Sequence, residues 1–172
     1  MGSSGCGERS WTRRPRALAE LLLLAVGRIG GGPEAALVTR YAARLRPALR
    51  VVELPDGRGS PAEIMRREAI AVQARLPAHA LVVALDRTGT APDSPHLARL
   101  LTLWSQTGRP VCFVIGGAEG LDQRLVAAAF HVLSLGPLTW PHMLARAMLA
   151  EQLFRAQSIA AGHPYHRGPR DA

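Results

Sequence analysis

The sequence predicts an α/β domain in which a parallel sheet of five strands is covered by helices on both faces. Two observations support this prediction. Short apolar runs alternate with longer helical stretches along the chain. Several of these runs are apolar at consecutive positions, which is typical of strands that are buried on both faces. We expect a single domain with a flavodoxin-like strand order.

Each predicted strand is a short apolar run. The run LLLLAV is apolar at every position, and ALVVALD stays apolar until its final aspartate. Because both faces of these runs are apolar, they belong in the middle of a covered sheet. In chain order, the expected strands are residues 21–26, 49–54, 80–86, 111–115 and 131–135.

The predicted helices have recognisable start signals. Pro33 and Pro141 stand where helices are expected to begin, and proline suits the first helical turn. Ser60 is the expected N-cap of another helix, with Glu63 at the spacing of a capping box. In chain order, the expected helices are residues 33–45, 61–76, 95–106, 121–128 and 142–161.

The chain is basic, and all its basic residues are arginine. The formal net charge is +8, which favours a polyanionic partner, most simply a nucleic acid. Basic composition that only aids solubility is the alternative. The absence of lysine excludes Schiff-base lysine chemistry and any phosphate-binding loop that ends in Gly-Lys-Ser or Gly-Lys-Thr.

Cysteine content and hydropathy indicate a reduced, cytoplasmic protein. Cys6 and Cys112 are far apart and form no CxxC pair, so neither a disulfide framework nor a zinc ribbon is expected. No apolar run approaches the roughly 18 residues that a membrane-spanning helix needs. Residues 1–18, rich in glycine, serine and arginine, are interpreted as a disordered extension before a domain of residues 19–172, with an expression remnant or a misassigned start as the alternatives. An export signal is disfavoured because Glu20 interrupts the apolar run.

Three glycine-bearing loops follow predicted strands, where ligands bind in parallel sheets. The loop at residues 27–32 does not have the spacing of a dinucleotide fingerprint, although Glu53 stands where a ribose-binding acid would, and a simple turn is favoured. The loop at 116–120 suits either a tight turn or close approach to a ligand. Backbone amides of the loop at 134–141 could hold an adenine or a carboxylate. His142 is interpreted as a capping or packed residue rather than a catalytic one.

The C-terminal stretch GHPYHR allows three interpretations. A metal site would use His163 and His166, but no cysteine or acidic ligand stands nearby, so no metal is expected. A solvated tail is the second. RNA contact fits best, because Tyr165 can stack on a base, Arg167 can bind phosphate and the histidines can donate hydrogen bonds.

Four motifs together identify a resemblance to a known family. The motifs are IGGAEG (115–120), LGPLTWPHMLAR (135–146), AEQLFRAQSI (150–159) and HPYHR (163–167). In this order and at these spacings, they resemble the ribosomal large subunit methyltransferase H family of the SPOUT superfamily. The resemblance covers about residues 21–167.

The resemblance implies a homodimer whose C-terminal part forms a trefoil knot. It implies methylation of N3 of a pseudouridine in the helix 69 loop of 23S rRNA, on assembled ribosomes. S-adenosylmethionine would lie in the knot, held largely by backbone groups. Carried over by position, the cofactor contacts are Leu85, Gly116, Leu135, Gly136, Pro137, Leu138, Thr139 and Trp140.

Catalytic residues are expected on the long helix and the tail. Glu151 and Arg155 lie four residues apart and share one helix face, which forms either an exposed ion pair or a border of the target base. In the second case Glu151 would accept or orient a proton, and Arg155 would bind phosphate or a carbonyl of the uracil ring. Tyr165 and His166 are the other expected catalytic residues. RNA contacts are expected from His163, Tyr165, His166 and Arg167. The alternative function is a non-enzymatic basic α/β module that binds rRNA or a nucleotide.

Overall fold

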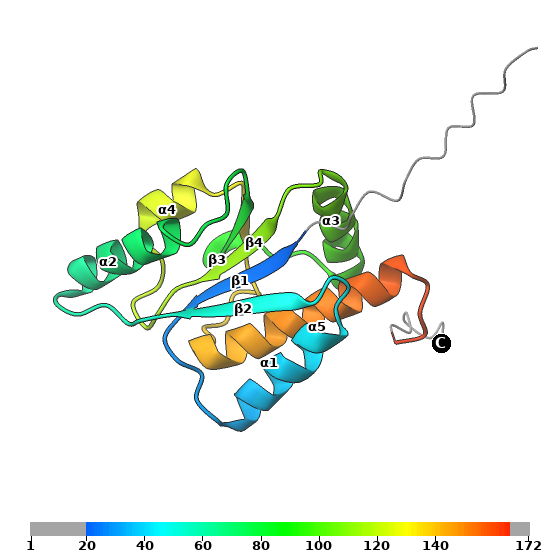
Figure 1. Ribbon diagram of the computed structural model, residues 1–172, viewed down its shortest axis with the longest axis horizontal. Coiled ribbons are helices and arrows are strands. Elements are labelled where there is room, and N and C mark those ends of the chain that lie inside the picture. Colours follow the sequence, from blue (N-terminus) through cyan, green and yellow to red (C-terminus); the bar gives the residue numbers. More distant parts are fainter. Residues whose placement is uncertain (1–19, 166–172) are drawn as a thin grey trace, which may run out of the picture.

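The computed structural model describes residues 20–165, in which strands and helices alternate (Figure 1). The extension expected at residues 1–18 and the tail residues His166 and Arg167 lie outside the described residues. In chain order the elements are β1 (Leu21–Val26), α1 (Pro33–Arg44), β2 (Leu49–Leu54), α2 (Pro61–Gln73), β3 (Leu81–Thr90), α3 (Ser94–Gln106), β4 (Val111–Ile115), α4 (Gln123–Ala128), β5 (His131–Leu133) and α5 (His142–Ala160).

The five strands form one parallel sheet in the order β2-β1-β4-β3-β5. The predicted α/β fold class is therefore confirmed. The detailed order differs from the flavodoxin-like order 2-1-3-4-5, because β4 lies between β1 and β3. Hydrophobic periodicity places strands along the chain but does not specify which strands become neighbours, so this exchange could not be read from the sequence.

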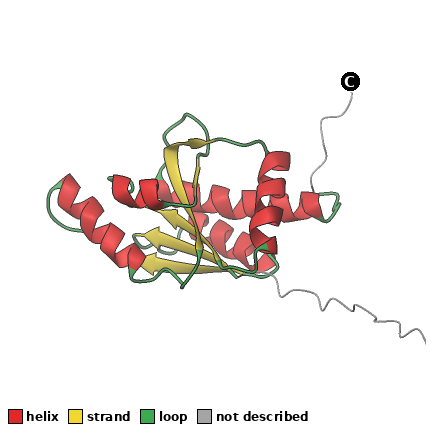
Figure 2. Cartoon of the chain, turned by 90° about the horizontal axis from the view of Figure 1, so that it is seen from above, coloured by secondary structure: helices red, strands yellow, loops and turns green. Residues whose placement is uncertain are grey.

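Helices cover both faces of the sheet, as Figure 2 shows from above. Side chains of β1 alternate between the faces, and all six are fully buried. Leu21, Leu23 and Ala25 pack in a core with residues of α1, α3 and α5. Leu22 and Leu24 pack in a second core with residues of α2 and α4. The continuous apolar run of β1 is thus explained by burial on both faces.

Strand β3 is longer than predicted. It continues beyond Asp86 to Thr90, with a register shift against β5 between Leu85 and Thr90. The Asp86 carboxylate accepts a hydrogen bond from the Thr88 N–H at 2.9 Å, and the Ser134 N–H donates to the Thr90 carbonyl at 2.8 Å. These polar residues interrupt the apolar pattern, and the sequence therefore indicated a strand end where the strand continues.

Gly89 is required where this extension of β3 passes β5. A Cβ on Gly89 would lie 2.5 Å from the backbone oxygen of Val132. We expect Gly89→Ala to lower the free energy of unfolding by about 1–3 kcal/mol, the usual result of overpacking. Urea denaturation measures the change, with Gly31→Ala as a matched control because a Cβ there meets no atom within 4 Å. Equal stability of the two variants would contradict the prediction.

Two further expectations concern the described part of the chain. No helix within residues 20–165 is both long and apolar enough to cross a membrane. Cys112 is fully buried in β4, and burial raises the pKa of its thiol to about 12. A thiol with this pKa is protonated at neutral pH, so Cys112 is a core residue rather than a nucleophile.

Candidate active site

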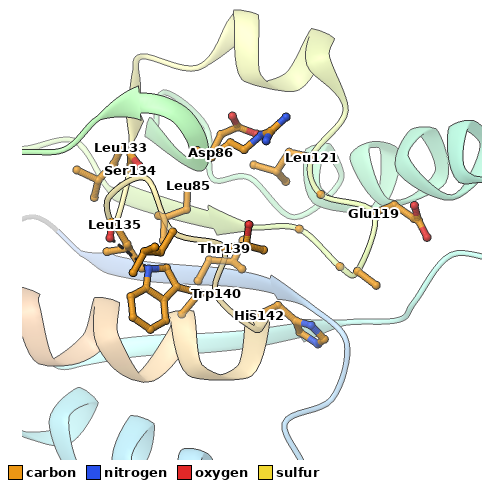
Figure 3. Close-up of a pocket in the computed structure, with 18 of the residues that line it drawn as sticks. Leu85, Asp86, Glu119, Leu121, Leu133, Ser134, Leu135, Thr139, Trp140 and His142 are labelled. Carbon is orange, nitrogen blue, oxygen red and sulfur yellow. Dashed lines mark hydrogen bonds between the residues drawn. The ribbon is translucent and has the colours of Figure 1, made fainter.

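A cavity of about 480 Å³ lies at the carboxyl ends of β3, β4 and β5, beside the first turn of α5 (Figure 3). The loops that follow these strands form its walls. Ligands in open parallel sheets bind at such strand ends, and this volume lies in the range of small-molecule sites. Of the residues expected to contact a cofactor, all except Pro137 line it: Leu85, Gly116, Leu135, Gly136, Leu138, Thr139 and Trp140.

The loop between β5 and α5 folds back on itself. The Gly136 N–H donates to Ser134 Oγ at 3.2 Å, and this hydroxyl donates to the Gly136 carbonyl at 3.1 Å. Trp140 Nε1 donates to the Leu135 carbonyl at 3.3 Å, so the indole ring is held by its own loop. Gly136 has a φ of +100°, a conformation that favours glycine. The loop is therefore shaped by its own polar contacts and by one glycine.

The glycine loop after β4 combines close packing with an open face. A Cβ on Gly116 would lie 2.6 Å from the backbone of Gly120, so Gly116 is required by the turn itself. Gly120 has a φ of +83°, and a Cβ there would meet no atom within 4 Å. The loop is therefore a tight turn that also lines the cavity, and close approach to a ligand stays a prediction.

Polar side chains that line the cavity were not predicted as site residues. They include Asp86, Glu119, Ser134 and His142. Ser134 directly follows β5, and Asp86 follows the apolar part of β3. A polar residue at the end of an apolar run is the signal that could have identified both. His142 was interpreted as a capping or packed residue, but the structure places its half-buried ring at the cavity (Figure 3).

A fully buried arginine connects α5 to the end of β1. Arg146 donates hydrogen bonds to the carbonyls of Val26 and Gly27, the latter at 3.0 Å. Its Nη1 lies 3.5 Å from Glu53 Oε1, which also accepts a hydrogen bond from the Ile29 N–H at 2.9 Å. Burial lowers the pKa of Arg146, an effect that the nearby carboxylate of Glu53 opposes. Glu53 therefore supports the loop after β1 and this arginine.

Glu151, Arg155 and Tyr165 form a separate cluster. Arg155 Nη2 donates to Glu151 Oε1 at 2.6 Å, and the Tyr165 hydroxyl donates to the same oxygen at 3.0 Å. The Tyr165 ring packs edge-on against Phe154 at 4.8 Å, and the Arg44 guanidinium lies 4.1 Å from the centre of the Phe154 ring. Partial burial and the hydrogen bonds of Tyr165 to Tyr41 and Glu151 raise the pKa of Tyr165, so its hydroxyl is protonated at neutral pH.

This cluster does not lie at the cavity within one subunit. The last cavity-lining residue of α5 is Ala145, and none of the cluster residues lines the cavity. At a rise of 1.5 Å per residue, Glu151 and Arg155 lie about 9 and 15 Å farther along the helix axis. The exposed His163 is also described, and its Nδ1 accepts a hydrogen bond from the Tyr165 N–H at 3.2 Å.

Within residues 20–165, no group of three or more His, Cys, Asp or Glu residues is placed to hold a metal ion. His166, the second histidine of the tail, lies outside this range.

Comparisons with known proteins agree on one family. Residues 20–166 match the family model described as predicted SPOUT methyltransferase. The chain is 62% identical over 152 residues to the Ribosomal RNA large subunit methyltransferase H of Acidiphilium cryptum (strain JF-5), covering 88% of this chain and 96% of that protein. It is 57% identical over 150 residues to the protein of the same name from Gluconacetobacter diazotrophicus, covering 87% and 99%.

A solved structure supports the fold. The probable methyltransferase from Bordetella pertussis Tohama I superposes with a TM-score of 0.50 at 15% sequence identity, covering 82% of this chain and 95% of that one. At this identity the likeness concerns the arrangement of the chain only.

Proposed function

The chain belongs to the SPOUT methyltransferase family and, within it, to the ribosomal RNA large subunit methyltransferase H family, and on this premise we propose that it is an rRNA methyltransferase that uses S-adenosylmethionine. The proposed target is N3 of a pseudouridine in the helix 69 loop of 23S rRNA, on assembled ribosomes in the cytoplasm. The family implies a trefoil knot in the C-terminal part of the domain. The main observation that supports the proposal is that the expected cofactor segments line the same cavity.

The cavity fits S-adenosylmethionine in size and in the groups that it offers. Its volume of about 480 Å³ suits a nucleoside with a short side chain. A Cβ on Gly120 or Gly136 would meet no atom within 4 Å, so backbone at these positions is open to a ligand. Leu85, Trp140 and the glycine loops would hold the adenosine part. When bound, the cofactor supplies an electrophilic methyl group on a sulfonium sulfur.

The protein must align the target nitrogen with that methyl group and remove the proton that the nitrogen carries. Alignment reduces the entropy cost of the reaction, and proton transfer makes the imide nitrogen a competent nucleophile. We propose that four catalytic residues hold and orient the target base: Glu151, Arg155, Tyr165 and His166. Because Glu151 and Arg155 lie about 9 to 15 Å beyond the cavity along α5, these groups would serve the cavity of the partner subunit in a homodimer.

RNA binding is proposed for the C-terminal tail. His163 is exposed, and His166 and Arg167 follow Tyr165 in the sequence. The Tyr165 ring packs on Phe154 and its hydroxyl binds Glu151, so stacking of this ring on a base would require it to leave that position. The net charge of +8, carried by arginine, favours contact with phosphate.

Mass spectrometry of 23S rRNA tests the proposed activity. A strain that lacks the gene should have one methyl group fewer on the helix 69 loop, and the purified protein with S-adenosylmethionine should restore it on ribosomes. Calorimetry with S-adenosylmethionine and with NAD separates this proposal from a nucleotide-binding module. Failure to bind S-adenosylmethionine, or an unchanged rRNA mass, would refute the proposal.

Residues 1–18 are proposed to lie outside the methyltransferase domain, which we place at residues 19–172. The described sheet begins at Leu21, and residues 1–18 show neither strand nor helix periodicity. We expect a protein that lacks residues 1–18 to retain wild-type methylation and dimer mass, measured by methyl-transfer assay and light scattering. Loss of activity in the trimmed protein would show that the domain begins earlier.

A further inference from the structure

Three ionisable side chains meet where the end of β1 approaches the first turns of α5. Gly27 follows β1 with a φ of +88°. The position of a Cβ on Gly27 would lie 3.0 Å from Asp56 Oδ1 and 3.5 Å from both His142 Nε2 and Arg146 Nη2. Asp56 comes from the loop after β2, whereas the other two belong to α5. Their functional atoms therefore surround one small volume that a side chain at position 27 would fill.

The members of this group differ in how they are bound. Arg146 is fixed by the carbonyls of Val26 and Gly27 and by Glu53. Within residues 20–165, by contrast, no hydrogen bond or ion pair engages the His142 ring or the exposed Asp56 carboxylate. His142 also lines the proposed cofactor cavity, at the end away from Leu133 and Ser134 (Figure 3). Both nitrogens of the His142 ring, beside the proposed cofactor cavity, are therefore free of hydrogen bonds to the described part of the protein. An imidazole in this position can accept a proton from a substrate.

Charged groups of both signs lie around His142. The charged groups that face it are Asp56 from the loop after β2, Arg146 from α5, and Glu53 from β2 through its ion pair with Arg146. Two carboxylates and one guanidinium give this group a net charge of −1. An imidazolium formed at His142 during proton transfer would bring the group to neutrality.

Glu151 is less suited to this role. Its Oε1 already accepts hydrogen bonds from Arg155 at 2.6 Å and from Tyr165 at 3.0 Å. Its Oε2 accepts a further hydrogen bond from Gln152 Nε2 at 2.8 Å, so both carboxylate oxygens already have donors. Within its own subunit Glu151 also does not line the cavity, whereas His142 does.

We propose that His142, supported by Asp56, is the proton acceptor of the methyl transfer, an inference that rests on the proposed function. The imide nitrogen of the target base gives its proton to His142 Nε2. The electron pair left on that nitrogen forms the new bond to the methyl carbon. The bond between that carbon and the sulfonium sulfur breaks, and its electron pair remains on sulfur as a neutral thioether. The imidazolium is stabilised by Asp56 and later returns the proton to solvent.

Substitution of His142 tests this assignment through turnover and cofactor affinity together. His142→Asn keeps a polar side chain that cannot accept a proton, and we expect turnover to fall about 100-fold, a usual contribution of general-base catalysis. Asp56→Asn should lower turnover about 10-fold, because the imidazolium loses a compensating charge. The affinity for S-adenosylmethionine, measured by calorimetry, should be unchanged in both. His96→Asn is the matched control, since His96 is exposed on α3 and lies outside the cavity lining.

Two readouts separate proton transfer from a structural role. Wild-type turnover should decline on the acid side, where imidazole becomes protonated and cannot act as base, and His142→Asn should remove this acid limb. In nuclear magnetic resonance spectra, Asp56→Asn should shift the ring resonances of His142 and leave those of His96 in place. An unshifted His142 ring would overturn the assignment.

The outcomes distinguish this inference from the proposed function. If wild-type protein methylates rRNA and His142→Asn retains at least half of that turnover, only the inference is overturned. If both His142→Asn and His142→Gln lose S-adenosylmethionine binding, it is also overturned, because the ring would then belong to the cofactor site. A wild-type protein that transfers no methyl group to rRNA would refute the proposed function itself.

Discussion

Removal of residues 163–172 is expected to abolish rRNA methylation without changing S-adenosylmethionine affinity or dimer mass. All cavity-lining residues precede the deleted segment, the last of them being Ala145. The deletion removes His163 and Tyr165 together with the proposed RNA contacts His166 and Arg167. Methyl transfer to ribosomes, calorimetry and light scattering measure the three properties. Full activity of the truncated protein would show that the tail is only solvated.

The truncated protein is expected to remain folded. The deletion removes the hydrogen bond from Tyr165 to Glu151 and the edge-on contact of its ring with Phe154. Each of these interactions contributes about 1 kcal/mol, which a stable domain tolerates. Tyr165→Phe is the matched variant because it removes the hydroxyl and keeps the ring. We expect it to lower turnover less than the deletion does.

A mixed dimer tests whether the tail serves its own subunit or its partner. One subunit is truncated after Gly162, and the other carries Gly136→Val. In a shared site, the intact cavity of the truncated subunit meets the intact tail of the other, so up to about half of wild-type turnover should return. A tail that acts within its own subunit predicts almost none. Inactive mixed dimers would therefore contradict the proposed composite site.

Gly136→Val is expected to weaken S-adenosylmethionine binding by at least about 100-fold, equivalent to about 2.8 kcal/mol. A Cβ at this position would meet no protein atom within 4 Å, and Gly136 lines the cavity. The new side chain would therefore occupy space that the cofactor needs. Calorimetry measures the affinity, and thermal unfolding shows whether the variant is folded. Wild-type affinity in a folded variant would refute the proposed cofactor site.

The choice of control for this variant follows from backbone conformation. Gly136 has a φ of +100°, so valine there also introduces strain of about 1–3 kcal/mol. Gly30 has a φ of +67°, equally open surroundings and no place in the cavity lining, so Gly30→Val matches the strain but not the position. Gly116→Val is unsuitable, because its Cβ would lie 2.6 Å from the backbone of Gly120 and distort the turn.

Local structure could be predicted because its signals are local. The run LLLLAV is apolar at each position, and the structure has β1 at these residues, buried on both faces. Ser60 and Glu63 showed capping-box spacing, and the Ser60 N–H donates to the Glu63 carboxylate at 2.9 Å. The proposed cofactor segments could be named because their motifs resemble those of a family, and these segments line one cavity.

Features that depend on long-range contacts could not be predicted. Arg146 is fully buried against β1, although an arginine on a helix is ordinarily expected to face solvent. Gly27 and Asp56 lie near His142 in the structure, although both are far from it in the sequence. Family motifs indicated the region around these residues, but only the three-dimensional arrangement assigns their contacts.

The position of β4 has a consequence for synthesis of the chain. Strand β4 lies between β1 and β3, although β3 precedes it in the sequence. While residues up to α3 have emerged from the ribosome, β1 and β3 each have an edge whose hydrogen-bonding partner has not yet been made. If these two edges paired with each other, they would occupy the place of β4 and hold the chain in a misfolded arrangement. In the nascent protein the edges of β1 and β3 that β4 will join therefore stay open to pairing with other chains until Val111–Ile115 emerges.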